Sequence, residues 1–263
     1  LRFPLEVLRA VRKQAADRFV VGVRLCVDEF FPGAITAEES VEIARTMVGE
    51  GLVDFINTTV GTYYSLHMMQ PTMHTPFGIS LDAVAGVKSA VQVPVIAGHH
   101  LDVLQAGEKI IGTGKADVVG IVRSLICDPD LPNKMKAGKA ADVRLCVRDN
   151  QGCVGRINQS KSLSCIQNPD VGNEKRSSLQ VAPQKKRLMI IGGGPSGLEA
   201  ARTASLRGHD VTLYERSVDV GGQVNLAARG AGRQRLGEVV RNLDRSIQGL
   251  DITLMTNTEV TVD

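Results

Sequence analysis

Tryptophan is absent from this chain, and aromatic residues make up only 3% of its 263 residues. So few flat side chains argue against a surface that stacks on nucleobases, and a formal net charge of +3 is too small to indicate a nucleic-acid partner. Long apolar runs are also missing, since none approaches the ~18 residues of a membrane span. The first residues show no signal-peptide pattern. We therefore expect neither nucleic-acid binding nor membrane insertion.

Cysteines are few, and their number is odd. Five cysteines without a secretory signal argue against a disulfide framework and for a reducing, cytoplasmic environment. Cys146, Cys153 and Cys165 fall within twenty residues of one another, which is the first indication of metal chemistry. Cys26 and Cys127 stand at strand ends and are expected to be small core residues.

The first half of the chain alternates strand and helix patterns. The expected strands are 19–25, 52–57, 93–97 and 117–121, and the expected helices are 4–17, 37–50, 81–90 and 103–111. Thr36 is a suitable N-cap for the second helix, and Gly51 is a suitable stop. Such alternation implies an α/β fold with a parallel sheet covered by helices. A doubly wound sheet and about half of a (β/α)₈ barrel both fit.

Glycines follow the last two of these strands. Gly98 precedes His99 and His100, while Gly120 precedes Arg123. If these are the final strands of a barrel, backbone N–H groups and a cationic side chain there would bind a phosphate. The alternative is a glycine turn with a surface arginine.

A loop from residue 58 to 78 would lie at the opening of the active site. Its ring side chains that can transfer protons are Tyr63, Tyr64, His67 and His74. They would line a substrate pocket or transfer protons there, unless they only pack within the loop.

The second half carries a dinucleotide-binding fingerprint. A polar linker, 172–186, precedes an expected strand at 187–191, a helix at 198–207 and a strand at 210–214. Gly192 allows the tight turn, Gly194 the approach of a pyrophosphate, and Gly197 close helix–strand packing, while Glu215 would hold ribose hydroxyls. A further helix is expected at 238–247, a strand at 252–255, and the start of another element at 259–263.

Several motifs resemble one flavoenzyme family over nearly the whole chain. They are residues 24–26, 98–100, 116–125 and 128–131. These segments resemble the C-terminal half of the flavin barrel in the multidomain branch of the old yellow enzymes. That branch includes 2,4-dienoyl-CoA reductase and trimethylamine dehydrogenase types. The resemblance favours the barrel and implies three regions: a half barrel at 1–142, an iron–sulfur segment at 143–186 and a truncated Rossmann-like domain at 187–263.

The resemblance implies an FMN site. Arg24 would reach the pyrimidine edge of the flavin, and the phosphate would be surrounded by Gly98, His99, His100, Gly120 and Arg123. The family usually has Gly-Arg where this chain has His99-His100, and imidazole is a weaker phosphate partner than guanidinium. His67 falls within one residue of an active-site histidine of the reductase-like relatives, so His67, Tyr63 and Tyr64 are the candidate catalytic residues.

The resemblance also implies a [4Fe–4S] cluster. Cys146, Cys153 and Cys165 keep the family's positions, but Asp149 stands where the family has a cysteine. A carboxylate is a harder ligand than a thiolate. The sequence leaves open a four-iron cluster with Asp149 or solvent on one iron, a three-iron or labile cluster, and an empty or zinc-binding site.

The dinucleotide is expected to be FAD rather than NAD, because Gly221, Gly222 and Gln223 resemble the continuation in FAD-binding domains of disulfide-reductase type. In trimethylamine dehydrogenase-like relatives the pocket holds ADP instead. The expected cofactor contacts are Gly192, Gly194, Pro195, Ser196, Gly197, Glu215, Arg216, Gly222 and Gln223.

The expected function is an NADH:flavin oxidoreductase that passes electrons between NAD(P)H, FAD, the cluster and FMN. Its small-molecule substrate would be an enoate or enoyl thioester, or an N-methylated amine. A non-catalytic dinucleotide-binding descendant is a further alternative, and a homo-oligomer is compatible with each of these. The resembled enzymes have about four more βα units before residue 1 and a second glycine motif after residue 263, so we expect a fragment.

Overall fold

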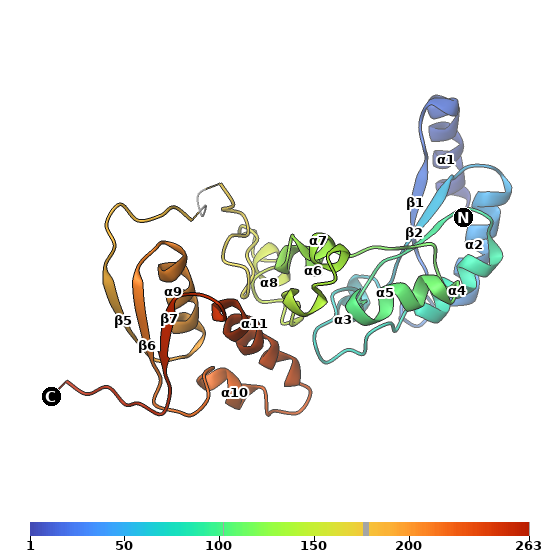
Figure 1. The fold of residues 1–263 in the computed structure, drawn as a ribbon. Helices are drawn as coiled ribbons and strands as arrows, with labels where there is room; N and C mark the ends of the chain where they lie inside the picture. Colours follow the sequence, from blue (N-terminus) through green and yellow to red (C-terminus); the bar gives the residue numbers. More distant parts are fainter. Residues whose placement is uncertain (102, 176–178, 263) are drawn as a thin grey trace. The chain divides into compact units, whose positions relative to one another are not determined.

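The computed structural model describes residues 1–101, 103–175 and 179–262. The chain divides into two compact units, Leu1–Val122 and Arg123–Asp263 (Figure 1). None of the helices in these described ranges combines the length and the apolar character needed to cross a membrane.

The first unit is an alternation of helices and parallel strands. Its helices are α1 (Arg2–Ala15), α2 (Ala37–Gly49), α3 (Leu66–Met69), α4 (Leu81–Ala90) and α5 (Val103–Gly112), with 3₁₀ turns η1 (Ala16–Arg18) and η2 (Tyr63–Ser65). Its strands are β1 (Gly22–Cys26), β2 (Phe55–Thr59), β3 (Val95–Ala97) and β4 (Val118–Val119). They pair in parallel in the order β1-β2-β3-β4. Sheet order that follows chain order is the arrangement of a (β/α)₈ barrel, whereas a doubly wound sheet reverses its order at a switch point.

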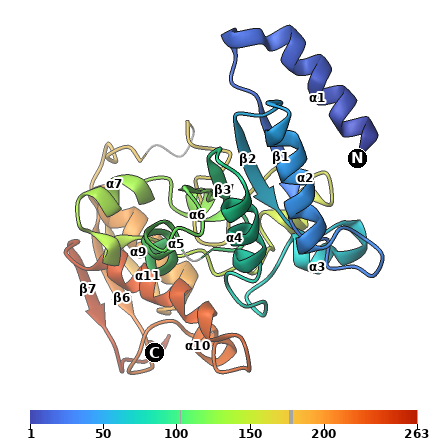
Figure 2. The same cartoon turned by 90° about the vertical axis from the view of Figure 1, so that its right-hand side faces the viewer.

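The core of this unit lies between the sheet and its helices. α2 packs against α4, and the two helices cover one face of the strands (Figure 2). The interior is formed by aliphatic residues from both layers, among them Ala44, Met47, Ile56, Val84, Val87, Val95 and Ala97. The carboxyl ends of the strands are thereby fixed relative to one another.

Most expected elements of the first unit are confirmed, with shifted boundaries. Thr36 forms a capping box with Glu39, and Gly51 follows α2 with φ 69°. β1 begins at Gly22 rather than residue 19, because the pairing register starts at Gly22 and Phe55. Phe19 before it is 66% exposed, so its apolar character did not indicate a buried strand.

The second unit contains a three-stranded parallel sheet preceded by short helices. These helices are α6 (Arg123–Cys127), α7 (Leu131–Lys136) and α8 (Val154–Ile157), with the 3₁₀ turn η3 (Ala140–Asp142). The remaining elements are β5 (Arg187–Ile191), α9 (Pro195–Leu206), β6 (Asp210–Tyr214), α10 (Gln223–Ala227), η4 (Gln234–Leu236), α11 (Gly237–Ile247) and β7 (Ile252–Met255).

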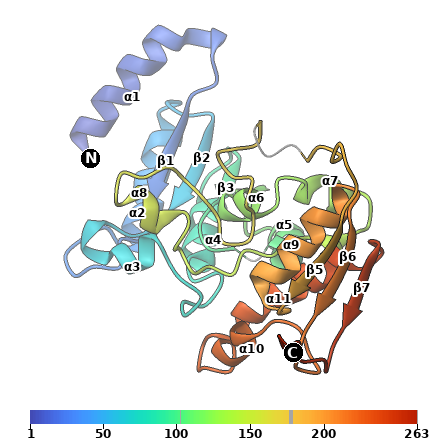
Figure 3. The same ribbon diagram turned by 90° about the vertical axis from the view of Figure 1, so that its left-hand side faces the viewer.

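Helices α9 and α11 pack on each other and cover one face of the sheet β5-β6-β7 (Figure 3). Leu198, Ala201, Val211, Leu213 and Ile247 form the buried centre of this layer. The expected strands and helices from residue 187 to 255 are confirmed. The element expected at 259–263 is not present over residues 259–262. Residues 176–178 of the expected linker and residue 263 lie outside the described residues.

Candidate functional site

Arg24, the residue expected at the flavin ring, lies near the carboxyl end of β1. In the parallel register it stands opposite Asn57. Its guanidinium donates to Asn57 Oδ1 and to Thr59 Oγ1, both at 3.1 Å. The side chain is nevertheless exposed. Two bonds to β2 therefore orient a planar cation that a ligand can still reach.

Gly98 and Gly120 lie against each other after β3 and β4. Gly120 N donates to Ala97 O at 2.8 Å, and a Cβ on Gly120 would lie 3.8 Å from Gly98 Cα. A Cβ on Gly98 would lie 2.9 Å from Thr58 O, closer than real side chains approach. The two glycines assigned to one phosphate-binding corner are thus together, with bare backbone at the strand ends.

Two consecutive histidines follow the first of these glycines, and both have left-handed backbone. The φ angles are 79° at His99 and 48° at His100. His99 Nε2 lies 2.6 Å from Met68 O, and His100 Nε2 lies 2.8 Å from Thr75 O. His100 is buried, and its ring stacks on Phe77 with centroids 4.7 Å apart. Both rings therefore contact the loop between β2 and α4.

The candidate catalytic side chains lie on that loop and are exposed. Tyr63 is 87% exposed and Tyr64 79%, and His67 and His74 are also exposed. Exposure of this degree argues against a packing role for Tyr63. Tyr64 stacks on Phe31, with centroids 5.1 Å apart. Sequence reasoning missed Phe31, because nothing in the loop after β1 indicates an aromatic partner.

Arg123, the cation expected at the FMN phosphate, begins α6 in the second unit. Its Nη1 donates to Asn150 Oδ1 at 2.8 Å. Burial lowers the pKa of this guanidinium below its usual value, while negative charge on Cys146 and Cys153 acts in the opposite direction. Arg123 therefore lies beside the cysteine segment.

Backbone contacts fold the cysteine segment onto itself. Ser164 N donates to Gly152 O at 2.8 Å, and a Cβ on Gly152 would lie 2.9 Å from Cys165 Cα. Only glycine allows this approach without a shift of the backbone. The contact brings the neighbourhood of Cys153 next to Cys165.

Hydrogen bonds and burial shift the pKa values of the ionisable side chains in this segment. Cys127 donates a hydrogen bond to Cys165 and thereby lowers the pKa of Cys165 to about 6, against the effect of burial. Burial raises the pKa of Cys146 and of Asp149. Cys127 is fully buried, as expected of a core residue, but its contact with Cys165 had no signal in the sequence.

The segment supplies donors that suit an iron–sulfur cluster. Within the described ranges, no three His, Cys, Asp or Glu side chains converge as one metal ion would require. A cluster spans more space than a single ion, and thiolates are its usual ligands. Three thiols and a carboxylate on one tightly folded segment fit it by type.

The glycine-rich turn after β5 leads directly into α9. Gly192 has φ 99°, and a Cβ on Gly197 would lie 1.9 Å from Gly192 O. Gly194 is the N-cap of α9, and Pro195 opens the helix. Because these glycines have no side chains, β5 and α9 can approach each other closely. The N–H groups at the N-terminus of α9 also stay accessible to a pyrophosphate.

Glu215, expected at the ribose, closes this turn. It is 7% exposed, and its Oε2 accepts from Gly193 N at 2.7 Å while its Oε1 accepts from Ser217 N at 2.8 Å. The Ser217 N–H is the main cause of a lowered Glu215 pKa. A Cβ on Gly222 would lie 3.5 Å from Gly194 Cα, so Gly222 lies beside the turn. The remaining expected contacts are exposed: Ser196, Arg216 and Gln223.

Within the second unit, the cysteine segment and the nucleotide-binding fold share a cavity of about 270 Å³. Its wall includes Cys165 and Gln167 from the segment, Ser196 from α9 and Asn242 from α11. The cavity therefore touches both a predicted cluster ligand and the N-terminus of the nucleotide-binding helix.

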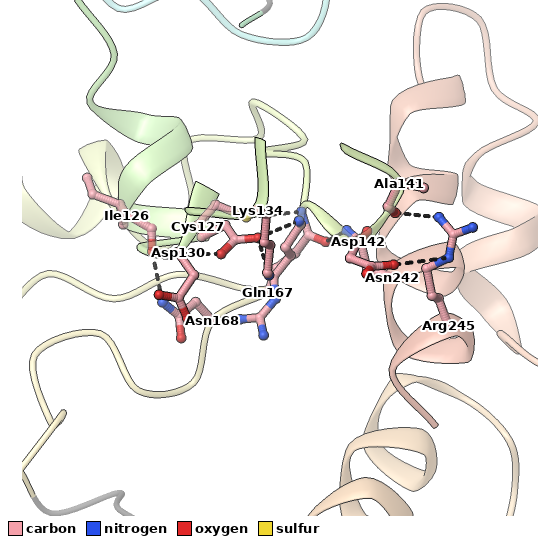
Figure 4. A network of polar contacts seen from close by, with 12 residues as sticks. Ile126, Cys127, Asp130, Lys134, Ala141, Asp142, Gln167, Asn168, Asn242 and Arg245 are labelled. Carbon is pink, nitrogen blue, oxygen red and sulfur yellow. Dashed lines mark hydrogen bonds and ion pairs between the residues drawn. The ribbon is translucent and has the colours of Figure 1, made fainter. Parts of the chain in front are cut away.

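Polar side chains connect α11 with the same segment (Figure 4). Asn242 Nδ2 donates to Gln167 Oε1 at 2.6 Å, and Gln167 Nε2 contacts Cys127 Sγ at 3.6 Å. Arg235, in η4 just before α11, donates to Cys146 O at 2.9 Å. Sequence reasoning missed Gln167 and Asn242, because neither belongs to a motif.

Comparison with known proteins identifies two family models along the chain. The model of the NADH:flavin oxidoreductase / NADH oxidase family matches residues 1–142. The model of the NAD(P)-binding Rossmann-like domain matches residues 190–245.

Curated relatives and solved structures cover nearly the whole chain. A metal reductase of Desulforamulus reducens is 36% identical over 99% of this chain and 39% of its own length. An N,N-dimethylglycine/sarcosine dehydrogenase of Chromohalobacter salexigens is 36% identical over 98% of this chain and 38% of its own length. The structure of a 2-naphthoyl-CoA reductase complex matches with a TM-score of 0.91 and 32% identity over 99% of this chain and 40% of that one. The chain thus spans about two fifths of the length of the curated relatives it matches.

Proposed function

Because the chain belongs to the NADH:flavin oxidoreductase / NADH oxidase family, we propose that it is the electron-transferring part of a reductase for unsaturated acyl thioesters. The observation that carries the proposal is the cavity shared by Cys165 and Ser196. Cys165, a predicted cluster ligand, and Ser196, in the expected nucleotide-binding turn, both line this cavity. That adjacency suits electron passage between a dinucleotide and a cluster.

FMN would be held by residues at the strand ends of the first unit. These are Arg24, Gly98, His99, His100 and Gly120. FMN supplies a ring that accepts and donates a hydride. Arg24, held by Asn57 and Thr59, would place its positive charge at the pyrimidine edge, where reduction leaves negative charge.

A [4Fe–4S] cluster would be held in the proposed segment 143–186 by Cys146, Cys153 and Cys165, with Asp149 or solvent at the remaining iron. Such a cluster supplies single-electron transfer. FAD, or ADP in its place, would lie on the turn from Gly192, with Glu215 at its ribose. NAD(P)H would be the electron donor.

The substrate is proposed from the loop and from the relatives. A 2-naphthoyl-CoA reductase complex is among the solved structures that match over 99% of this chain, which supports reduction of a conjugated acyl thioester. Tyr63, Tyr64 and His67 are exposed on the loop and would line the pocket or transfer a proton. The second candidate is oxidation of an N-methylated amine, because the stacked Phe31 and Tyr64 rings could bind a protonated amine by cation–π attraction.

The full-length protein separates these functions. Anaerobic assays would supply NAD(P)H with an aromatic or enoyl thioester, and an N-methylated amine with an artificial electron acceptor. We expect turnover of the thioester, together with iron and acid-labile sulfide. Turnover of the amine alone favours the second candidate. Bound FAD without iron, sulfide or any turnover would contradict both and indicate a non-catalytic dinucleotide-binding protein.

A further inference from the structure

His99 and His100 follow the bare backbone of Gly98, yet their rings extend to the loop that carries the candidate catalytic residues. We propose that both are positioning residues whose rings attach residues 66–78, the second part of the loop, to the phosphate-binding turn. The phosphate is then bound by backbone N–H groups and not by the imidazoles. The inference rests on the proposed FMN function. It concerns how His99 and His100 form the corner that follows Gly98.

The hydrogen-bond roles of the two rings follow from their partners. A carbonyl oxygen only accepts, so Nε2 must donate in both contacts, to Met68 O at 2.6 Å and to Thr75 O at 2.8 Å. In a neutral imidazole, Nδ1 is then an acceptor and cannot bind an anion. Only a doubly protonated ring could also donate to phosphate, and His100, at 3% exposure, has little water to stabilise that charge.

The turn holds the loop at several points. Met68 lies in α3, directly after His67, so the bond from His99 fixes the backbone beside a candidate catalytic residue. Further along the loop, the His100 ring stacks on Phe77 with an interplanar angle of 9°. Gly78 N donates to His100 O at 3.2 Å. Ring and backbone contacts together attach both ends of the loop.

The backbone conformation of His99 and His100 supports separate roles for their rings and their main-chain N–H groups. Both histidines have φ in the left-handed region, at 79° and 48°, which non-glycine residues rarely adopt. Such conformations persist when surrounding contacts hold them, and they cluster at ligand-binding turns. Turns of this kind gather main-chain N–H groups into anion-binding concavities. Here the contacts of the two rings with the loop stabilise these left-handed backbone conformations.

The test compares binding of FMN with binding of riboflavin, which lacks the phosphate. His99→Asn and His100→Asn in the full-length protein keep a residue type that tolerates left-handed backbone but shorten the side chain, so the carbonyl is out of reach. We expect the ratio of FMN to riboflavin affinity to stay at its wild-type value. Proteolytic cleavage within residues 66–78 should accelerate, and the KM for substrate should rise with little change in kcat.

A phosphate-binding role for the imidazoles predicts a different result in the same experiment. If the imidazoles bind the phosphate, each variant lowers FMN affinity relative to riboflavin by about tenfold or more, the loss expected for a hydrogen bond to a charged group. Unchanged cleavage of the loop would also overturn the proposal. Gly120→Ala is the control for sensitivity: a Cβ there meets no protein atom closer than 3.6 Å, would occupy the proposed phosphate corner, and should lower the FMN to riboflavin ratio.

Two more variants separate donation from stacking. His100→Gln keeps an amide donor for Thr75 O and should restore protection of the loop, whereas His100→Phe keeps the stack on Phe77 and should not. Wild-type protein that binds neither flavin would refute the proposed function. The cleavage comparison would still decide the histidine assignment in that case, since it needs no flavin.

Discussion

Gly194 and Gly197 are three residues apart in the nucleotide-binding turn, but they lack a side chain for different reasons. A Cβ on Gly197 would lie 1.9 Å from Gly192 O, inside the protein itself. A Cβ on Gly194 would meet nothing within 4 Å, so the space in front of it is free for a ligand. Gly197 therefore serves folding, and we expect Gly194 to serve binding.

Alanine at the two positions should separate these roles. Gly197→Ala should destabilise the protein by about 1–3 kcal/mol, the usual cost of overpacking, and lower nucleotide affinity as a consequence. Gly194→Ala should leave the unfolding midpoint nearly unchanged and still weaken FAD or ADP binding. Denaturant unfolding and nucleotide titration check the pair. Equal stability of the two variants would contradict the account.

The hydrogen-bond partners of individual site residues were the least predictable part of the site. The glycines and Glu215 were proposed from spacing and context that are local in the sequence, and Arg24 was proposed from the family resemblance. Asn57 and Thr59, which orient Arg24, come from another strand and belong to no motif. Such contacts are created by strand register, which is set by the fold as a whole.

At the scale of elements, Asp54 and Asp117 perform the same task at the starts of β2 and β4. Each accepts a backbone N–H from the neighbouring segment at 2.7 Å, Val21 N for Asp54 and Val95 N for Asp117. Each also pairs with a cation, Arg12 Nη2 at 3.0 Å and Lys88 Nζ at 2.8 Å. The pKa of Asp54 is lowered chiefly by the Val21 N–H, and that of Asp117 chiefly by Lys88.

These two carboxylates should make the first unit acid-sensitive. Because the folded pKa is lowered, their stabilising effect is fully present above the unfolded value of about 4 and is lost as pH falls through the folded value. Unfolding by denaturant at several acid pH values should show stability falling with pH. The Asp54→Asn and Asp117→Asn double variant should show a shallower fall. An unchanged slope would contradict the assignment.

Helix α11 is expected to stabilise the cysteine segment through Asn242. Asn242→Ala leaves the Gln167 Oε1 atom without the donor that it has at 2.6 Å, at a cost of about 1–3 kcal/mol. Gln248→Ala, at the end of the same helix, removes only an exposed bond and should change stability by less than about 0.5 kcal/mol. Thermal unfolding of both variants tests this, and equal effects would argue against the role of Asn242.

Elements with strong local signals were predicted well. The helix after Thr36 has its capping box, and β6 and β7 have the bounds that were expected. The short helices α6, α7 and α8 were not predicted, because four to six residues are too few to show helical periodicity. Their positions depend on contacts such as Asn168 Nδ2 to Ile126 O at 2.9 Å.

At the scale of the whole molecule, two family models match different parts of the chain, and the first extends from the first unit into the start of the second. Residues 1–142 match the flavin oxidoreductase family, and residues 190–245 match the Rossmann-like domain. The Rossmann-like domain was predictable from its glycine fingerprint, whereas the flavin oxidoreductase family was predicted from the resemblance of segments such as 98–100 and 116–125. The cluster is harder to predict, since Asp149 changes its donor set.

Anaerobic titration of the full-length protein with NAD(P)H tests the central claim most directly, because it asks whether electrons entering at the dinucleotide-binding fold reach FMN. The account predicts that NAD(P)H bleaches the FMN absorbance in the wild type. In Gly194→Ala, whose binding of FAD should be weakened, the same reduction should be at least about tenfold slower at unchanged FMN content. FMN reduced at the wild-type rate in Gly194→Ala, or a protein that takes up no FMN, would contradict it.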